Sequence, residues 1–415
     1  MDKLAFSSEI PISANAREAN KVKNSIRGKV AIVGIGESTY YKHGQAPSSE
    51  FRLCLDAIFA AAKDAGIAVT DIDGFSSYAD DRNDPARLAH ALSIKQVNYS
   101  VMQWGGGGTG CMAAITNAAA GIVAGYSDYV VVHRALAQGQ FGRYGQAYPM
   151  TQLPGEFSYT APYGVLSAAQ MFSMRVHRFM HEHGVKQSAL RAVALACYEH
   201  AQKNPRAIMY GKPLSAEQYD SSRIITEPFH LYDLCQENDG AAALILTSME
   251  RAKETGARPI AILGGVTSSQ AREGIVGGIS YYNSPYSATA NMKVIAEKAY
   301  SMAGVGPKDI DVVQSYDHFT GGVLMSLVDH GLCPLDEINE FFTKENLTAP
   351  SGLLPINTSG GHLAECYVHG LSLVNEAVRQ LRGESFNQVP GAKTALCIGG
   401  ALGAPSGNLI LGREG

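Results

Sequence analysis

Short apolar runs that end in glycine alternate with stretches of helical period along most of the chain. Residues 30–36 (VAIVGIG) have the continuous apolarity of a buried strand, and residues 51–65 place apolar side chains at helical spacing. The polar turn Asp-Ile-Asp-Gly at 71–74 then leads into another apparent strand. Such alternation predicts an α/β fold with mainly parallel strands and right-handed crossovers.

Two motifs of this first half return later in the chain. Ala-Gly-Ile, which begins at residue 65, is matched by Ala-Gly-Val from residue 303, and Asp-Ile-Asp from residue 71 is matched by the same three residues from 309. Both motifs therefore recur after 238 residues. An offset that two separate motifs share indicates an internal duplication.

Changes in pattern divide the chain into an arm and two halves. Residues 1–28 are polar and mixed in charge, and we expect an extended arm or a tail that docks a partner. The halves are expected at 29–250 and 257–415. Within the first half, the alanine-rich residues 111–124 predict a helix packed closely between sheets. Residues 139–227 interrupt the alternation and are expected to be an inserted loop domain with substrate-binding surface.

Composition and charge exclude several classes of protein. The 415 residues are 46% apolar and 17% charged, which is typical of a well-buried globular protein, and the net charge of −4 gives no sign of nucleic-acid binding. Seven scattered cysteines without a Cys-x-x-Cys pair argue against disulfides and structural zinc and favour a reducing cytoplasm. No apolar run reaches the roughly 18 residues of a membrane span. His177 and His181 have metal-ligand spacing but lack an evident third ligand, so no metal is expected.

The stretch PINTSGGHLAECYVHGL at 355–371 concentrates polar chemistry between two apolar segments. Its turn, from Asn357 through Gly360 and Gly361, opens onto an apolar run of helical type that ends near Leu381. Backbone N–H groups at such a helix start can receive developing negative charge. The titratable or polar side chains that follow the turn are Glu365, Tyr367 and His369.

This stretch resembles the NTSGG…GHPxG segment of thiolases, whose histidine stabilises the enolate of an acyl-CoA thioester. Aligned from Asn357, that histidine falls on Tyr367. NDGAAALIL from residue 238 and CIGG from residue 397 resemble further thiolase motifs, and HRFMHEHG with EHAQKNPRA resembles the sterol-carrier-protein-X branch. The resemblance spans about residues 29–412. It implies the thiolase fold: duplicated βαβαβ halves in a layered α/β/α/β/α arrangement with mixed, mainly parallel sheets.

The same resemblance exposes a missing nucleophile. Thiolases carry a reactive cysteine at the start of the buried helix, and here Gly107 occupies that position in the motif GGTG. Cys111 stands one helical turn further on, and core packing explains it better than a displaced nucleophile does. The glycines at 105–108 favour close backbone approach, either to the acyl group or to the facing half of the chain, over a phosphate cradle, because no P-loop lysine follows.

A second active-site motif has changed in the same way. Tyr-Asp-His-Phe at 316–319 resembles the HDCFS or NEAF segment of thiolases, which puts Tyr316 at the oxyanion-hole position. Loss of the nucleophile with tyrosine at both positions resembles the lipid-transfer-protein-type aldolases of bacterial steroid side-chain degradation. That subgroup cleaves a β-hydroxyacyl-CoA by a retro-aldol reaction to a ketone or aldehyde and a shorter acyl-CoA. It works in complex with a partner that has an OB-fold and a zinc ribbon.

The resemblance and the chemistry together assign candidate roles. Tyr316 and Tyr367 are expected to act as the acid/base and oxyanion-stabilising pair, with either able to take the β-hydroxyl proton. Cys397 occupies the position of a thiolase base, so it either protonates the enolate or is a buried thiol inherited with the fold. The groups expected to orient or activate the phenols are His318, His369 and Asp317. The positions expected to approach the acyl-CoA are Gly107, Asn357, Gly360 and Gly361.

Several alternatives stay open at this point. His362, after the two glycines, either reshapes the pocket or makes a local hydrogen bond. No cofactor is expected beyond the CoA of the substrate, and the expected assembly is a homodimer with the OB-fold partner. Two rival functions remain: an acyltransferase or condensing subunit that uses Cys111, Cys397 or other subunits, and a scaffold without catalysis.

Overall fold

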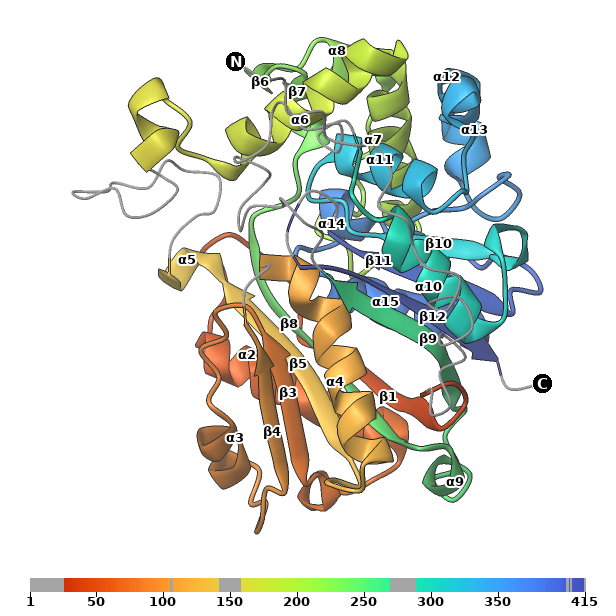
Figure 1. Cartoon of the computed structure of the whole chain (residues 1–415). Helices are drawn as coiled ribbons and strands as arrows, with labels where there is room; N and C mark the ends of the chain where they lie inside the picture. Colours follow the sequence, from red (N-terminus) through yellow and green to blue (C-terminus); the bar gives the residue numbers. More distant parts are fainter. Residues whose placement is uncertain are drawn as a thin grey trace, which may run out of the picture.

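The computed structural model of the chain describes residues 26–104, 107–141, 158–268, 289–400, 403 and 405–413. The arm expected at 1–28 therefore lies almost entirely outside the described residues. The described part is built on one continuous sheet, which crosses the molecule in Figure 1. No helix in this part combines the length and apolarity that crossing a bilayer requires.

The two halves contribute the same strand order to this sheet. In the first half the order is β1 (Val30–Glu37), β8 (Asn238–Ser248), β5 (Val130–Ala137), β3 (Gly74–Tyr78) and β4 (Tyr99–Gln103), with β2 (Tyr41–Lys42) on β8. In the second half it is β9 (Ile260–Ser268), β12 (Ser406–Arg413), β11 (Thr394–Gly399) and β10 (Val312–Ser315). β1 and β9 join the halves through a short antiparallel pairing at Ala31 and Ile32.

Matched elements confirm the duplication. Helix α2 (Glu50–Ala65) packs on β1, and α10 (Lys293–Ala303) packs on β9. Each ends at a glycine in the left-handed region, Gly66 at φ 70° and Gly304 at φ 66°, where a side chain would be strained. The repeated Asp-Ile-Asp motif also has one structural task, because its last aspartate accepts a backbone N–H at the next strand: Asp73 from Tyr129 at 2.9 Å, and Asp311 from Thr394 at 2.9 Å.

The α/β class is confirmed, but the expectation of mainly parallel strands is wrong. β3 pairs in parallel with β4 and β5, and β10 with β11. The pairings of β1 with β8 and β9, of β5 with β8, and of β12 with β9 and β11 are antiparallel. Parallel neighbours need a crossover on one face of the sheet. β12 follows β11 after residues 400–405, which leaves no room for a crossover, so the chain returns antiparallel.

Two helices lie between the halves of the sheet and form the middle of five layers. Helix α4 (Cys111–Val123) contacts β3, β5 and β8 on one side and β9 and β12 on the other, and α15 (Leu371–Arg382) also contacts strands of both halves. All of α15 is buried. α2 and α10 cover the outer faces (Figure 1). The alanine-rich run is thus a central helix, because small side chains let the two halves approach it closely.

The insertion between β5 and β8 is largely helical rather than a set of loops, as far as it is described. It contains α5 (Gln138–Phe141), α6 (Ala168–His183), α7 (Gln187–Ala201), α8 (Ala216–Asp220), β6 (Ile224–Thr226) and β7 (Phe229–His230). Two capping boxes start its helices, Ser167 with Gln170 and Ser215 with Gln218, a signal that is readable in the sequence.

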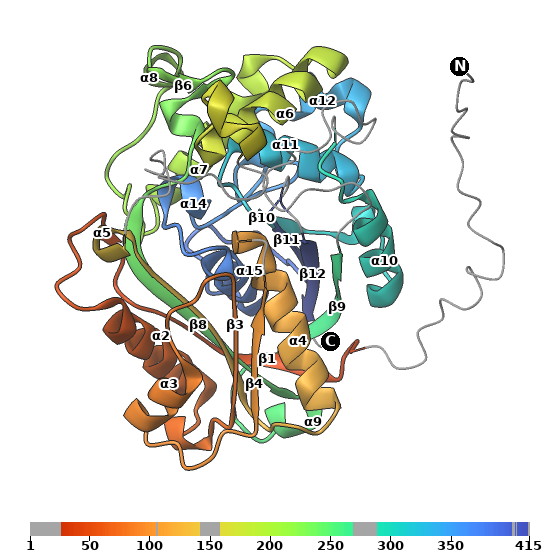
Figure 2. The ribbon, with the colours of Figure 1, turned by 60° about the vertical axis from the view of Figure 1, so that its left-hand side comes forward.

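The insertion packs on the second half of the chain. α7 contacts α11 (Thr320–Asp329), α13 (Lys344–Leu347) and α14 (Gly361–Ala364). Figure 2 shows α6 and α7 beside α11 above the carboxyl end of β10. The remaining helices are α3 (Pro85–Ala91), α9 (Met249–Ala252) and α12 (Ile338–Phe341).

Close approach of α2 to β1 yields a stability prediction. A Cβ at Gly34 would lie 2.2 Å from the Ala61 carbonyl oxygen and 2.7 Å from the Ala65 Cβ. Because backbone cannot move aside cheaply, Gly34→Ala should lower the free energy of unfolding by about 1–3 kcal/mol. Urea unfolding measures this. Gly306→Ala is the control, because its Cβ would meet only the Asp309 carboxylate at 3.7 Å; equal losses in both variants would contradict the close-packing argument.

Candidate active site

Tyr316 and Tyr367 meet at the carboxyl end of β10. Their hydroxyl oxygens are 2.9 Å apart, and the side chains are 2% and 8% exposed. The Tyr316 amide donates to the Ile398 carbonyl, which continues the β10–β11 pairing to the site. Leu136 and Leu373 pack against the two phenols. The sequence predicted these tyrosines from separate motifs, and the structure brings them into direct hydrogen-bond contact.

Three histidine rings surround the pair. His318 and His362 lie 4.9 and 4.6 Å from the Tyr316 ring, and His369 lies 5.1 Å from the Tyr367 ring, between centroids. Burial lowers the pKa of His318 to about 3, and it lowers the pKa values of His362 and His369 well below their ordinary value. All three imidazoles are therefore neutral at physiological pH.

The Asp317 carboxylate occupies the anion-binding position that the glycine turn creates. Its carboxylate accepts the backbone N–H groups of His362 at 2.9 Å and Leu363 at 3.2 Å. Burial raises its pKa to about 6, although these hydrogen bonds oppose the rise. Gly361 must lack a side chain, because a Cβ there would lie 2.2 Å from the carboxylate. The N–H groups expected to receive developing charge thus bind the chain's own aspartate.

The other predicted turn residues hold this arrangement in place. Asn357 bonds both backbone groups of Ser315: its Oδ1 accepts from the Ser315 N–H at 2.7 Å, and its Nδ2 donates to the Ser315 carbonyl at 2.8 Å. Gly360 has φ 111°, a conformation that favours glycine. A direct contact of Asn357, Gly360 or Gly361 with the acyl-CoA stays a prediction.

Residues 365–370 interrupt the helix that was expected to run to Leu381. α14 ends at Ala364 and α15 begins at Leu371. The Tyr367 amide donates to Asn238 Oδ1 at 2.7 Å instead of to a helical carbonyl. His362 makes the local hydrogen bond left open above, since its Nε2 accepts from the Gly370 N–H at 3.1 Å. The break turns Tyr367 and His369 toward the site.

Arg134 is a site residue that the sequence reasoning missed. Its Nε donates to His369 Nδ1 at 3.1 Å, and its Nη2 donates to Asp80 at 2.9 Å, although the arginine side chain is only 1% exposed. Since Nδ1 of His369 accepts, its other ring nitrogen carries the proton. The Tyr78 hydroxyl also donates to the His369 carbonyl at 2.8 Å. A signal was available: an arginine within the apolar strand sequence VVVHRALA.

Gly108, rather than Gly107, lies against the tyrosine pair. A Cβ at Gly108 would be 1.7 Å from the Tyr316 hydroxyl oxygen, whereas a Cβ at Gly107 would meet nothing within 4 Å. The absence of a side chain at 108 therefore makes the space that the Tyr316 phenol fills. Any residue other than glycine at 108 would exclude this position of Tyr316.

Known proteins share this chain's sequence and architecture. Residues 279–413 match the family model "thiolase C-terminal domain-like". A 17-hydroxy-3-oxo-4-pregnene-20-carboxyl-CoA lyase of Mycobacterium tuberculosis is 35% identical, over 93% of this chain and 100% of the relative. A steroid side-chain-cleaving aldolase of Thermomonospora curvata is 34% identical, over 93% of this chain and 98% of the relative. The chain belongs to the thiolase superfamily, in its aldolase branch.

Solved structures agree with this assignment. The Ltp2-ChsH2(DUF35) aldolase has a TM-score of 0.86 at 32% identity, over 94% of this chain and 99% of that chain. Human mitochondrial 3-ketoacyl-CoA thiolase has a TM-score of 0.68 at 15% identity, over 94% of this chain and 100% of that chain, which shows the shared fold. The thiolase fold predicted from the sequence is confirmed.

The two cysteines considered for this aldolase are fully buried. Burial raises the pKa of Cys111 to about 12, and burial also raises the pKa of Cys397, with a further contribution from Cys111. Both belong to an apolar cluster with Val368 and Leu371. Thiols in such surroundings stay protonated and are poor nucleophiles. The catalytic role suggested for Cys397 stays a prediction. Among the described residues, no group of three His, Cys, Asp or Glu is arranged to hold a metal ion.

The neighbouring residues Gly107 and Gly108 should respond differently to substitution by alanine. Gly108→Ala should displace the Tyr316 phenol and reduce the aldolase kcat by about 100-fold, because a shift of about 1 Å in a reacting group has an effect of that size. Gly107→Ala, whose φ is 51°, should cost about 1 kcal/mol of stability without a comparable loss of kcat. Steady-state kinetics and thermal unfolding of both variants measure the difference. Similar kcat values in both variants would contradict the steric argument.

Glu365 predicts a pH dependence of stability. Burial raises its pKa from 4.5 to about 7, against the opposing Arg206 guanidinium, so the folded protein binds this proton more tightly than the unfolded chain does. Ionisation above pH 7 therefore destabilises the fold, and this cost is absent below pH 4.5. Glu365→Gln keeps an acceptor for Asn204 Nδ2, which donates to Oε1 at 2.8 Å.

The variant should thus exceed the wild type in unfolding free energy at pH 8 by up to about 3 kcal/mol, and the difference should shrink at pH 5. Urea unfolding at the two pH values measures it. Glu345→Gln, at an exposed position, is the matched control. A difference that is independent of pH would show that Glu365 does not titrate in this range.

Proposed function

We propose that this protein cleaves a β-hydroxyacyl-CoA by a retro-aldol reaction, giving a ketone or aldehyde and a shorter acyl-CoA, and that the acyl group is a steroid side chain. The hydrogen bond between Tyr316 and Tyr367 is the observation that carries the proposal, because it pairs two groups able to transfer protons in a site that lacks the thiolase nucleophile. The names of the mycobacterial and Thermomonospora relatives, a pregnene-carboxyl-CoA lyase and a steroid side-chain-cleaving aldolase, support the substrate class.

The reaction needs only proton transfer and enolate stabilisation. Loss of the β-hydroxyl proton lets the oxygen electrons form a carbonyl, the Cα–Cβ bond breaks, and its electron pair moves into the thioester enolate. The two phenols relay the proton: one accepts it from the β-hydroxyl while passing its own to the other, which returns a proton to Cα. Atoms and charge balance without an acyl-enzyme and without an external base.

The surrounding groups fit a relay between neutral groups. The three neutral imidazoles pack against the phenols without adding charge, and Arg134 holds His369 in one orientation. In such a buried site, hydrogen bonds to a developing enolate are strong because little water screens them. The raised pKa of Cys111, to about 12, speaks against the rival acyltransferase, which requires a thiolate.

We also propose a homodimer in the cytoplasm that works with a DUF35-type partner carrying an OB-fold and a zinc ribbon. The aldolase structure named with ChsH2(DUF35) supports the partner. β4 ends the strand order of the sheet, and Met102 and Trp104 at this edge are 50% and 79% exposed, which suits pairing with a second copy. The seven cysteines are all free thiols, which fits a reducing compartment.

Tyrosine variants test the reaction. With the DUF35-type partner present, the wild type should convert a tertiary β-hydroxy steroid acyl-CoA to a ketosteroid and a shorter acyl-CoA, detected by mass spectrometry. Tyr316→Phe and Tyr367→Phe should each lower kcat by about 10²–10⁴-fold with little change in KM, because only the proton-transfer hydroxyl is lost. The double variant should be scarcely worse than either single variant, since the two groups act as a unit.

A buried tyrosine outside the site gives the matched control. The Tyr300 hydroxyl donates to the His330 carbonyl, so Tyr300→Phe also removes one buried hydrogen bond and should leave kcat near the wild-type value. Unchanged cleavage by the double variant would contradict the relay mechanism. An acyl adduct on Cys111 or Cys397, without cleavage, would instead support the acyltransferase.

A further inference from the structure

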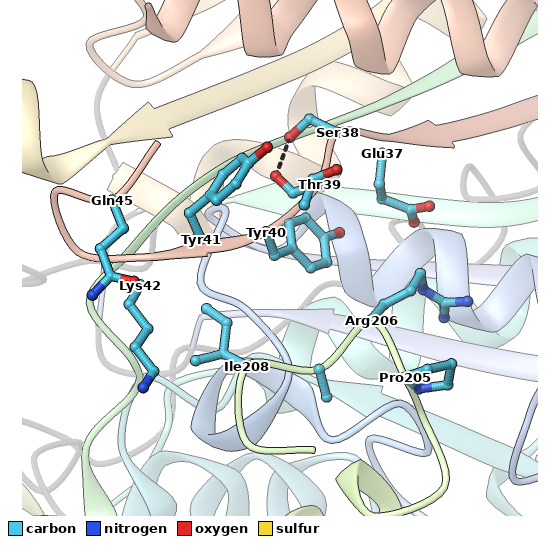
Figure 3. A pocket seen from close by; sticks show the side chains of 11 residues that line it. Glu37, Ser38, Thr39, Tyr40, Tyr41, Lys42, Gln45, Pro205, Arg206 and Ile208 are labelled. Atoms are coloured by element: carbon cyan, nitrogen blue, oxygen red, sulfur yellow. Dashed lines mark hydrogen bonds between the residues drawn. The ribbon is translucent and has the colours of Figure 1, made fainter. Parts of the chain in front are cut away.

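A cavity of about 600 Å³ opens between the first half and the insertion. Its walls come from residues 37–42 and Gln45 of the first half and from residues 205–208 of the insertion (Figure 3). Ile208 donates its backbone N–H to the Glu365 carbonyl at 3.0 Å, and Met209 donates to the Ala364 carbonyl at 3.1 Å. One wall of the cavity is thus bonded to the chain just before Tyr367.

One end of this cavity holds hydrogen-bond donors. Figure 3 shows the Tyr40 hydroxyl and the Arg206 guanidinium directed to the end where Glu37 lies. The Tyr40 hydroxyl and the Nε and Nη2 atoms of Arg206 are buried and make no hydrogen bond to any described residue. Arg206 Nη2 lies 3.5 Å from Glu365, too far for a hydrogen bond of normal length.

Carboxylates at this end already offset the positive charge of Arg206 and Arg379. The Glu37 carboxylate is bound by Arg379 and by Asn375, while Arg206 faces Glu365 and Glu376 at 3.5 and 3.9 Å. The donors there therefore suit an uncharged acceptor, such as an amide carbonyl or a hydroxyl oxygen, rather than an anion.

The other end carries unbalanced positive charge. Lys42 lies at the end of the cavity opposite Arg206 (Figure 3), and the exposed Lys212 is so close to it that Lys42 lowers the pKa of Lys212. Within the described ranges, no carboxylate forms an ion pair with either lysine. Two adjacent ammonium groups repel each other, and an anion bound between them relieves that repulsion.

We propose that this cavity binds an organic phosphate, with the phosphate at Lys42 and Lys212 and an uncharged hydrogen-bond acceptor at Tyr40 and Arg206. Two sources have this chemistry: the CoA portion of the substrate, in which case the proposal rests on the proposed function, and a separate phosphorylated metabolite. Either ligand would contact the wall that is bonded to the Tyr367 segment.

Calorimetric titration of the full-length protein tests the site with inorganic pyrophosphate and with CoA. Lys42→Met/Lys212→Met should weaken pyrophosphate binding at least 10-fold, because both positive charges at the phosphate end are lost. Lys95→Met/Lys308→Met removes two exposed lysines elsewhere and should bind pyrophosphate as the wild type does. Equal affinity of the wild type and the Lys42/Lys212 variant, or absence of pyrophosphate binding, would overturn the proposal.

Competition between pyrophosphate and CoA distinguishes the two possible sources of the bound phosphate. Displacement of pyrophosphate by CoA, together with weaker CoA binding in Tyr40→Phe, identifies CoA as the ligand. Simultaneous binding of both, with CoA affinity unchanged by the lysine substitutions, identifies a separate phosphorylated metabolite. A wild type that binds pyrophosphate through these lysines but cleaves no steroid thioester would contradict the proposed function alone, so the two failures are distinguishable.

Discussion

The rest of the site depends on the hydrogen bonds that the buried Asp317 carboxylate accepts. Asp317 follows Tyr316 at the end of β10, and its carboxylate accepts the backbone N–H groups of His362 and Leu363 in α14. His362 stands three residues before the segment 365–370, which carries Tyr367. A buried carboxylate is costly unless such donors surround it, so the strand end and the turn are stable only together. One buried charge thus sets the relative position of two phenols that are 51 residues apart in the chain.

Space at Gly108 is what allows the Tyr316 phenol to take its position. A Cβ at residue 108 would lie 1.7 Å from the Tyr316 hydroxyl oxygen, so a side chain there and the phenol would occupy the same volume. Gly107, which aligns with the thiolase nucleophile, is different, because a Cβ there would meet nothing within 4 Å. The missing nucleophile and the space for the phenol are therefore two separate features of neighbouring glycines.

The fold and the tyrosine pair could be predicted from the sequence more fully than the residues that surround the pair. The 238-residue offset predicted the duplication because equivalent turns, Asp73 and Asp311, keep the same hydrogen bonds. The helix break at 365–370 was hidden, because its decisive contact comes from Asn238, 129 residues away. Arg134 was missed for a similar reason: a strand arginine has no evident partner until folding brings His369 beside it. Local pattern predicts elements, whereas side-chain partners depend on tertiary contacts.

The electrostatics of the site favour a mechanism that moves protons without creating lasting charge. Two formal charges of the site, on Arg134 and Asp317, are engaged by Asp80 and by the α14 backbone. The imidazoles are kept neutral by burial, so a full tyrosinate would lack a mobile counter-charge there. A relay avoids this cost, because each phenol gains one proton as it loses another. The enolate then becomes the one developing anion, and fixed hydrogen-bond donors stabilise a transition state of that kind most effectively.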